Sequence, residues 1–317
     1  MHPRHSLTPP PSFEGFDADS TLGALLIGVL VSYMLFGVTT TQTYIYHGRF
    51  PNDSRRMKSL VACVWFCELG HAICIGHMLY VLLISRYGHP ESLTNIPKSL
   101  VASILFNAIV AVCVQGFFSY RIYRLWKKLY VPLLAWSLSF LFLGATGVVF
   151  VIGLQSLPYQ TFEEQWGWLL DSLWGVAATN DLIIAGTLVF WLLGRRGESA
   201  DGDRTADLVD KIIAWTIETG VVTSAAAILN LACFVTMKNN YIWIAWYVVT
   251  ARLYSNSFLA SLNSRATLRT MNQISPSLPY PIHSSVNTEV PDLTFLDEMR
   301  MPSMRTSFQS STGPKAI

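Results

Sequence analysis

Charge is scarce in this sequence. Only 13% of the residues are charged and 51% are hydrophobic, whereas soluble domains carry roughly 25% charged residues. The net charge of +2 is too small to indicate a nucleic-acid surface, and no block of Lys and Arg is interleaved with aromatic residues as such a surface needs. We therefore expect no nucleic-acid partner.

Paired cysteines and soluble catalytic motifs are also missing. The five cysteines fall within apolar stretches, and none forms a pair between loops, so no disulfide framework is expected. No G-x-S-x-G, P-loop or G-x-G-x-x-G motif lies in a suitable context, and the loops are too short to form a catalytic domain. The sequence therefore favours a function other than catalysis, and it predicts no cofactor.

Long apolar stretches, by contrast, fill the chain. A hydrocarbon core of ~30 Å requires about 20 residues of helix, since each residue rises ~1.5 Å. Seven stretches meet that length. They predict an all-α membrane protein, a seven-transmembrane-helix bundle over residues 20–263, with spans at residues 21–46, 60–84, 98–123, 131–154, 169–193, 209–235 and 241–263.

The two ends of the sequence differ in composition from this central part. Residues 1–19 are polar and rich in proline, and residues 264–317 are dominated by Pro, Ser and Thr with few large apolar side chains. Such segments cannot bury enough apolar surface to offset the entropy of ordering. We predict a disordered N-terminal tail and a mostly disordered C-terminal tail.

The basic residues are distributed unevenly among the loops. The loop over residues 155–168 has no Lys or Arg and carries Glu163 and Glu164. Because Lys and Arg concentrate in cytoplasmic loops, the N-terminus is predicted outside and the C-terminus in the cytoplasm of a multi-pass protein, in the plasma membrane rather than an internal one. The first, third and fifth loops hold most basic residues: Arg49, Arg55, Arg56, Lys58, Arg124, Lys127, Lys128, Arg195, Arg196 and Arg204.

Five ionisable residues inside the predicted spans are candidate site residues, because charge within a bilayer is costly unless it is paired or hydrated. Glu68 and Glu218 are expected roughly 10–14 Å from the cytoplasmic ends of their spans, and Asp181 and Arg252 somewhat deeper, so that these side chains can share one layer. His71 lies three residues after Glu68, on the same helical face, where the two side chains can touch.

Three interpretations of this layer remain open. Arg252 can bridge one or two of the acids and hold the spans together. The layer can instead line a polar cavity that binds a ligand or ion. A catalytic metal is the third interpretation, because Glu68, His71 and Asp181 are able to hold a divalent ion. A zinc hydrolase would be expected to show a further His pair, so no metal is predicted.

The end of the third predicted span carries Tyr120 and Arg121, where receptor bundles often place an arginine. These two residues are candidates for a cytoplasmic switch. The alternative is that Arg121 extends to the membrane interface and anchors the helix.

The last predicted span ends in RLYSNSFLASLNSR at residues 252–265, and Trp65, Glu68 and His71 fit a W-x-x-[DE]-x-x-H motif. These motifs, of which the first is the most specific, resemble those of a large family of basidiomycete fungal multi-pass, seven-transmembrane proteins that carry the domain of unknown function 6534. The resemblance implies the architecture but no ligand or reaction. Its other matching residues, in the order of the family, are Leu22 to Gly28, Phe36, Gly37, Gln42, Tyr46, Pro51 to Asp53, Lys58, Gln115, Phe117, Phe118, Tyr120, Arg121, Leu125, Thr219, Gly220, Thr223 and Ser224.

Three functions fit these observations. The first is a receptor-like seven-helix sensor with a small-molecule ligand and a cytoplasmic signalling partner, although D-R-Y and N-P-x-x-Y motifs are missing, and the last span has no lysine to bind retinal. The second is a transporter or channel that uses the buried acids, although no repeats or Pro-interrupted helices suggest one. The third is an intramembrane metal-dependent hydrolase.

Overall fold

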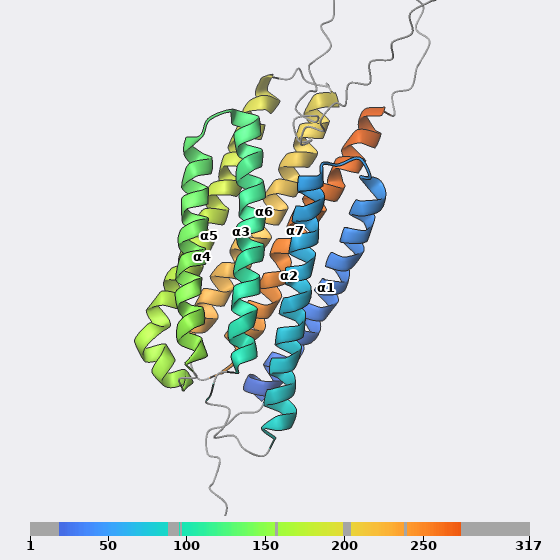
Figure 1. Ribbon diagram of the computed structural model, residues 1–317. Helices are drawn as coiled ribbons and strands as arrows, with labels where there is room; N and C mark the ends of the chain where they lie inside the picture. The colour runs from blue at the N-terminus through green and yellow to red at the C-terminus, as the bar shows by residue number, and fades with distance from the viewer. Residues whose placement is uncertain are drawn as a thin grey trace, which may run out of the picture.

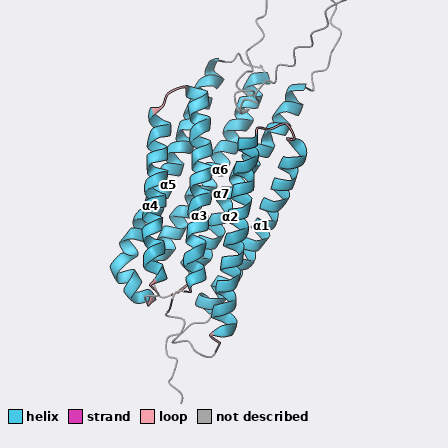
Figure 2. Ribbon diagram, viewed as in Figure 1, coloured by secondary structure: helices cyan, strands magenta, loops and turns pink. Residues whose placement is uncertain are grey.

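The computed structural model describes residues 19–87, 95, 97–155, 158–198, 204–237 and 240–273. The predicted N-terminal tail to residue 18 and the C-terminal tail beyond residue 273 lie outside this part of the chain. Figure 2 shows that the described residues are almost entirely helical. The long helices are α1 (Ala24–Arg49), α2 (Arg55–Tyr80), α3 (Lys98–Trp126), α4 (Tyr130–Leu154), α5 (Tyr159–Glu198), α6 (Arg204–Thr236) and α7 (Ile242–Gln273).

Successive helices run in opposite directions in one bundle (Figure 1). The connections after α1, α3 and α5 therefore lie at one end, together with the end of α7; we call this the basic end, since it holds the basic loops. Helix α7 contacts α1, α2, α3 and α6. Its residues Val248, Arg252, Ser255 and Phe258 are fully buried, so α7 is the helix around which the others are arranged.

Local sequence sets where several helices begin and end. The Ser54 side chain accepts a hydrogen bond from the Met57 backbone N–H at 3.3 Å, which caps the start of α2. Lys127 follows α3 with a φ of 58°, the left-handed conformation that ends many helices. Helix α3 begins directly after Pro97, whose fixed φ suits the start of a helix.

Five helices, α1 to α5, are long and apolar enough to cross a membrane. Within the described part of α6 the apolar helix is shorter, Gly220–Thr236, and α7 is not among the five. Large apolar side chains are exposed on the outer faces of the bundle, as a lipid environment requires: Ile27, Met34, Phe66, Phe140, Phe190 and Val221. These features indicate a multi-pass membrane protein.

Two helix boundaries differ from the prediction. Helix α5 begins at Tyr159, so most of the predicted fourth loop, residues 155–168, is helical, and its Phe162 is buried against the core. Helix α7 continues past Asn263 to Gln273, so the predicted boundary at residue 264 falls inside a helix. Hydropathy did not predict the start of α5 or the end of α7, because both segments contain polar residues between the apolar residues that pack against the bundle.

Two glycines allow helices to approach closely. A Cβ added at Gly28 of α1 would lie 2.7 Å from the Ala245 Cα of α7, and one added at Gly220 of α6 would lie 2.6 Å from the Ala185 Cβ of α5. Small residues at such crossings let backbones come together in membrane bundles.

Candidate functional site

Arg252 joins α7 to α1 and α2. Its guanidinium forms an ion pair with Glu68 of α2, and Nη1 also donates to the Glu68 backbone carbonyl at 2.9 Å. Nε donates to Ser32 Oγ of α1 at 3.0 Å, and the guanidinium carbon lies 5.2 Å from the centre of the Phe36 ring. The prediction that Arg252 contacts an acid of another span is confirmed, and Glu68 is that acid.

His71 takes no part in this ion pair. It is buried, its ring centroid lies 6.2 Å from that of Tyr247 in an edge-to-face arrangement, and neither ring nitrogen has a hydrogen-bond partner among the described residues. The expected interaction between Glu68 and His71 is therefore not formed, because the Glu68 carboxylate points to Arg252.

Asp181 of α5 belongs to a separate cluster, which ties four helices together. Gln115 Nε2 of α3 donates to Asp181 Oδ1 at 2.9 Å, and the Tyr254 hydroxyl of α7 donates to Oδ2 at 2.6 Å. Ser139 of α4 and Asn180 of α5 both donate to Gln115 Oε1, at 2.8 and 3.0 Å. Asp181 therefore has neutral partners, not Arg252.

These two clusters correct the expectation of a single charged layer. Arg252 and Tyr254 are two residues apart on α7, which gives them similar heights but places them about 200° apart around the helix. The Arg252 cluster consequently faces α1 and α2, and the Asp181 cluster faces α3 and α5. Glu218, the remaining predicted member, lies in α6 among residues whose side chains are outside the described part.

At the basic end, Arg121 of α3 points into the bundle. Its Nη1 donates to Ser261 Oγ of α7 at 3.1 Å. This contact links α3 to α7 inside the bundle, so the Arg121 guanidinium does not extend away from the helices as the anchoring interpretation requires. Tyr120, the other switch candidate, is partly buried on the same turn.

A further ion pair holds the end of α7 against the loop between α1 and α2. Arg265 Nη2 lies 2.7 Å from Asp53 Oδ2, which also accepts from the Tyr46 hydroxyl at 2.9 Å. The Arg265 guanidinium carbon lies 4.5 Å from the centre of the Phe50 ring. Residues of three separate motifs in the sequence thus meet at one place.

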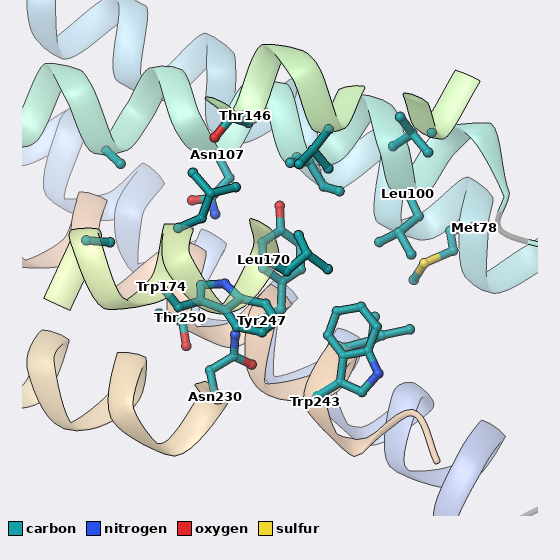
Figure 3. Close-up of a pocket in the computed structure, with 18 of the residues that line it drawn as sticks. Met78, Leu100, Asn107, Thr146, Leu170, Trp174, Asn230, Trp243, Tyr247 and Thr250 are labelled. Atoms are coloured by element: carbon teal, nitrogen blue, oxygen red, sulfur yellow. The ribbon is translucent and has the colours of Figure 1, made fainter. Parts of the chain in front are cut away.

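A cavity lies at the opposite end of the bundle from the basic loops. We call it the main cavity; its volume is about 110 Å³. It extends from Asn95 and Pro97, before α3, to Tyr254 near the middle of α7. Five helices, α3 to α7, contribute most of its lining, and the residues around it include Leu100, Thr146, Leu170, Trp174, Asn230 and Trp243 (Figure 3).

Contacts between connecting segments shape the outer part of the main cavity. Asn95 forms an isolated antiparallel bridge with Pro158, and its carbonyl accepts from Arg86 Nη1 at 2.7 Å. The connections after α2 and α4 are thereby held together beside the cavity.

Two polar side chains that line the main cavity are almost fully buried without a hydrogen-bond partner among the described residues. Thr146 of α4 is 2% exposed and Asn230 of α6 is 1% exposed, and Thr146 Oγ1 and Asn230 Oδ1 are unpartnered. Asn107 Oδ1 of α3 is also unpartnered. Figure 3 shows Asn107 and Thr146 on one side of the space and Asn230 on the other. Buried polar atoms of this kind need an explanation, such as water or a ligand.

A second cavity, of about 40 Å³, lies beside Asp181. Gln115, Thr223 and Ser257 also line it. Tyr254 lines both cavities, and its hydroxyl binds Asp181.

Within the described residues, no three His, Cys, Asp or Glu side chains are grouped closely enough to hold a metal ion. Glu68 and His71 lie on the α2 side of α7 and Asp181 on the α5 side, so the metal-binding set considered from the sequence is not assembled.

The sequence interpretation missed the main cavity. None of the predicted site residues whose side chains are described, Glu68, His71, Asp181 and Arg252, lines it. Its lining is made of ordinary apolar and aromatic residues, which look the same in a sequence whether they fill a core or surround a space. Asn107, Thr146 and Asn230 are uncharged, and so gave a weaker signal than the buried acids. The available clue was that these three polar residues lie in apolar spans, each in the half of its span away from the basic loops.

The fold and the apolar helices define a helical membrane protein. Residues 177–267, which run from α5 to α7, match the model of a family described as a family of unknown function, DUF6534. The match includes Asp181, Arg252, Tyr254 and Arg265. No curated protein and no solved structure matches the chain.

Proposed function

We propose that the protein is a receptor-like sensor with seven membrane-spanning helices in the plasma membrane, and that its small-molecule ligand binds in the main cavity. One observation carries this proposal: the cavity lies at the end of the bundle away from the basic loops. The positive-inside rule assigns that end to the outside and the C-terminus to the cytoplasm. A ligand outside the cell would then reach the cavity directly.

The packing of α7 supports counting it as a span. Its buried residues contact α1, α2 and α3, which are themselves apolar enough to cross a membrane. The polar side chains that lower its hydropathy, such as Arg252 and Ser255, are buried inside the bundle and not exposed to lipid.

A chain of contacts connects the main cavity to the basic end. Tyr254 lines the cavity and donates to Asp181, which accepts from Gln115 of α3. Further along α3, Arg121 donates to Ser261 of α7. A ligand that displaces Tyr254 would act on α3 and α7 together. In this proposal Tyr120 and Arg121 are the residues that pass the change to a cytoplasmic partner.

A cavity-filling variant tests the sensor without knowledge of the ligand. Thr146→Trp fills the main cavity from α4, and an environment-sensitive dye on Lys127→Cys, in a Cys63→Ala background, reports on the basic end. We expect a changed dye emission for Thr146→Trp and none for Phe140→Trp, which adds the same ring to the lipid-facing side of α4. An unchanged emission in a folded Thr146→Trp protein contradicts the proposal.

A transporter or channel is the second candidate, because Tyr254 lines both cavities. Movement of this side chain would join them. In sealed vesicles, a thiol at Ser257→Cys in the second cavity should react with reagent added at either face of a transporter. In a sensor, reagent added at the cavity end should not reach it. No observation among the described residues favours a metal-dependent hydrolase.

A further inference from the structure

The main cavity contains no charged side chain among the described residues that line it. Asp181, which is bonded to the cavity residue Tyr254, already accepts hydrogen bonds on both oxygens. A charged ligand would leave water for this space without gaining a counter-charge, which is strongly unfavourable. The lining therefore discriminates against both anions and cations.

Aromatic rings form much of the wall. Trp174, Phe234 and Trp243 pack in a cluster with centroid distances of 4.9, 5.2 and 5.9 Å, and both tryptophans line the cavity. Phe142 and Phe162 add further apolar surface. Walls of this composition bind apolar molecules through area burial and ring contacts.

The unpartnered polar atoms are the feature that selects among apolar molecules. Threonines elsewhere in the bundle, such as Thr179 and Thr250, donate to the carbonyl four residues earlier, at 2.7 and 2.8 Å. Thr146 makes no such bond, although it is buried in a helix. Its hydroxyl and the Asn230 amide oxygen are thus available to a molecule inside the cavity.

We propose that the main cavity binds an uncharged, mainly apolar molecule that carries a hydroxyl or carbonyl group, with Thr146 and Asn230 as its hydrogen-bonding partners. This inference rests on the proposed function, because it names the ligand class of the same site. The aromatic walls hold the apolar part, and the two polar side chains fix its orientation from opposite helices, α4 and α6.

Thiol reagents of matched reactivity test the charge preference. Thr146→Cys places a thiol of similar size in the cavity, on a helix without native cysteine. Neutral 3,3-dimethylbutyl methanethiosulfonate, which has nearly the shape of the cationic reagent, is compared with the cationic trimethylammonioethyl and anionic sulfonatoethyl analogues, and modification of residue 146 is followed by mass spectrometry. Rates are divided by those of Tyr87→Cys, an exposed position outside the helices. We expect the neutral reagent to react at least tenfold faster than either charged one.

The outcomes separate the two proposals. Equal normalised rates for the three reagents mean that the cavity is open but indifferent to charge, which overturns the ligand class and leaves the sensor in place. No reaction with any reagent, in a protein that elutes as a single folded species, means that the cavity is closed, which contradicts the sensor itself.

A protection experiment tests the hydrogen-bonding part. The probes are 3-phenylpropan-1-ol, propylbenzene, 3-phenylpropanoate and 3-phenylpropylamine, which share one apolar frame. We expect the alcohol to protect Asn107→Cys from the neutral reagent at a concentration severalfold below that of propylbenzene, and the two ions to give no protection. In Thr146→Val the advantage of the alcohol should shrink. Equal protection by alcohol and hydrocarbon, or protection by an ion, overturns the inference.

Discussion

On the side of the bundle formed by α1, α2 and α7, polar groups of different helices bond to one another. Asn256 donates to the Leu35 carbonyl at 3.2 Å and Asn263 to the Gln42 carbonyl at 3.0 Å, beside the Arg252 and Glu68 pair. Around the main cavity, the Thr146 hydroxyl and the Asn230 amide oxygen have no partner among the described residues. The α1 side is built as a scaffold, and the cavity side combines unpartnered polar atoms with open space.

The difference between the α1 side and the cavity side also explains why the charged residues did not predict the position of the main cavity. Buried charges must be paired, and pairing uses up the groups that could bind a ligand. Several buried atoms on the scaffold side also lack partners among the described residues: Arg252 Nη2, both ring nitrogens of His71, and the amide oxygens of Gln42, Asn256 and Asn263.

Removal of Arg252 should have the largest effect. Arg252→Leu leaves the Glu68 carboxylate buried without a partner, and breaking such a pair costs about 3–5 kcal/mol. We expect a clear fall in the thermal unfolding temperature in detergent, and little change for the exposed Arg56→Leu. The double variant Glu68→Leu/Arg252→Leu should be less unstable than the two single effects added together. Full additivity would show that the pair is not the source of the loss.

Loss of the Tyr254 hydroxyl should have the second-largest effect on stability. Tyr254→Phe removes a donor to a buried carboxylate, and hydrogen bonds to charged groups are worth about 1.5–3 kcal/mol. The thermal unfolding temperature of Tyr254→Phe should therefore fall, and that of the exposed Tyr44→Phe should equal that of the native protein. If Tyr254→Phe unfolds at the native temperature, the Asp181 cluster does not hold the helices together.

The close crossing of α1 and α7 gives a prediction with an internal control. Gly28→Ala places a Cβ against Ala245, and overpacking of this kind costs about 1–3 kcal/mol. Gly37→Ala, on the same helix, meets no atom within 4 Å, and should be neutral or slightly stabilising because alanine favours helix. Equal behaviour of the two variants in thermal unfolding would contradict the tight crossing.

The smallest effects compare two hydroxyls on α4. Ser139→Ala removes a group that bonds Gln115 and Asn180, and should cost about 1 kcal/mol. Thr146→Val replaces an unpartnered buried hydroxyl with a methyl group and should leave stability unchanged or slightly raised. A loss from Thr146→Val as large as that from Ser139→Ala would remove the distinction between scaffold and cavity.

The helical bundle could be predicted from the sequence because length and apolar content follow directly from the thickness of a bilayer. The pairing of Arg252 with an acid followed from the cost of a buried guanidinium. Which acid Arg252 pairs with, Glu68 or Asp181, could not be predicted, because that depends on which face of α7 packs against which neighbouring helix. The cavity depends on how side chains of five helices pack together. The sequence around residues such as Leu170 and Trp174 does not show whether they fill a core or line a cavity.

The side of the membrane on which the main cavity opens tests the account most directly. Tyr87→Cys marks the cavity end, and Lys127→Cys marks the basic end, each in a Cys63→Ala background. In intact cells that carry the protein in the plasma membrane, a membrane-impermeant maleimide should label Tyr87→Cys at once and Lys127→Cys only after permeabilisation. The reverse pattern would place the cavity in the cytoplasm and contradict a sensor for molecules outside the cell.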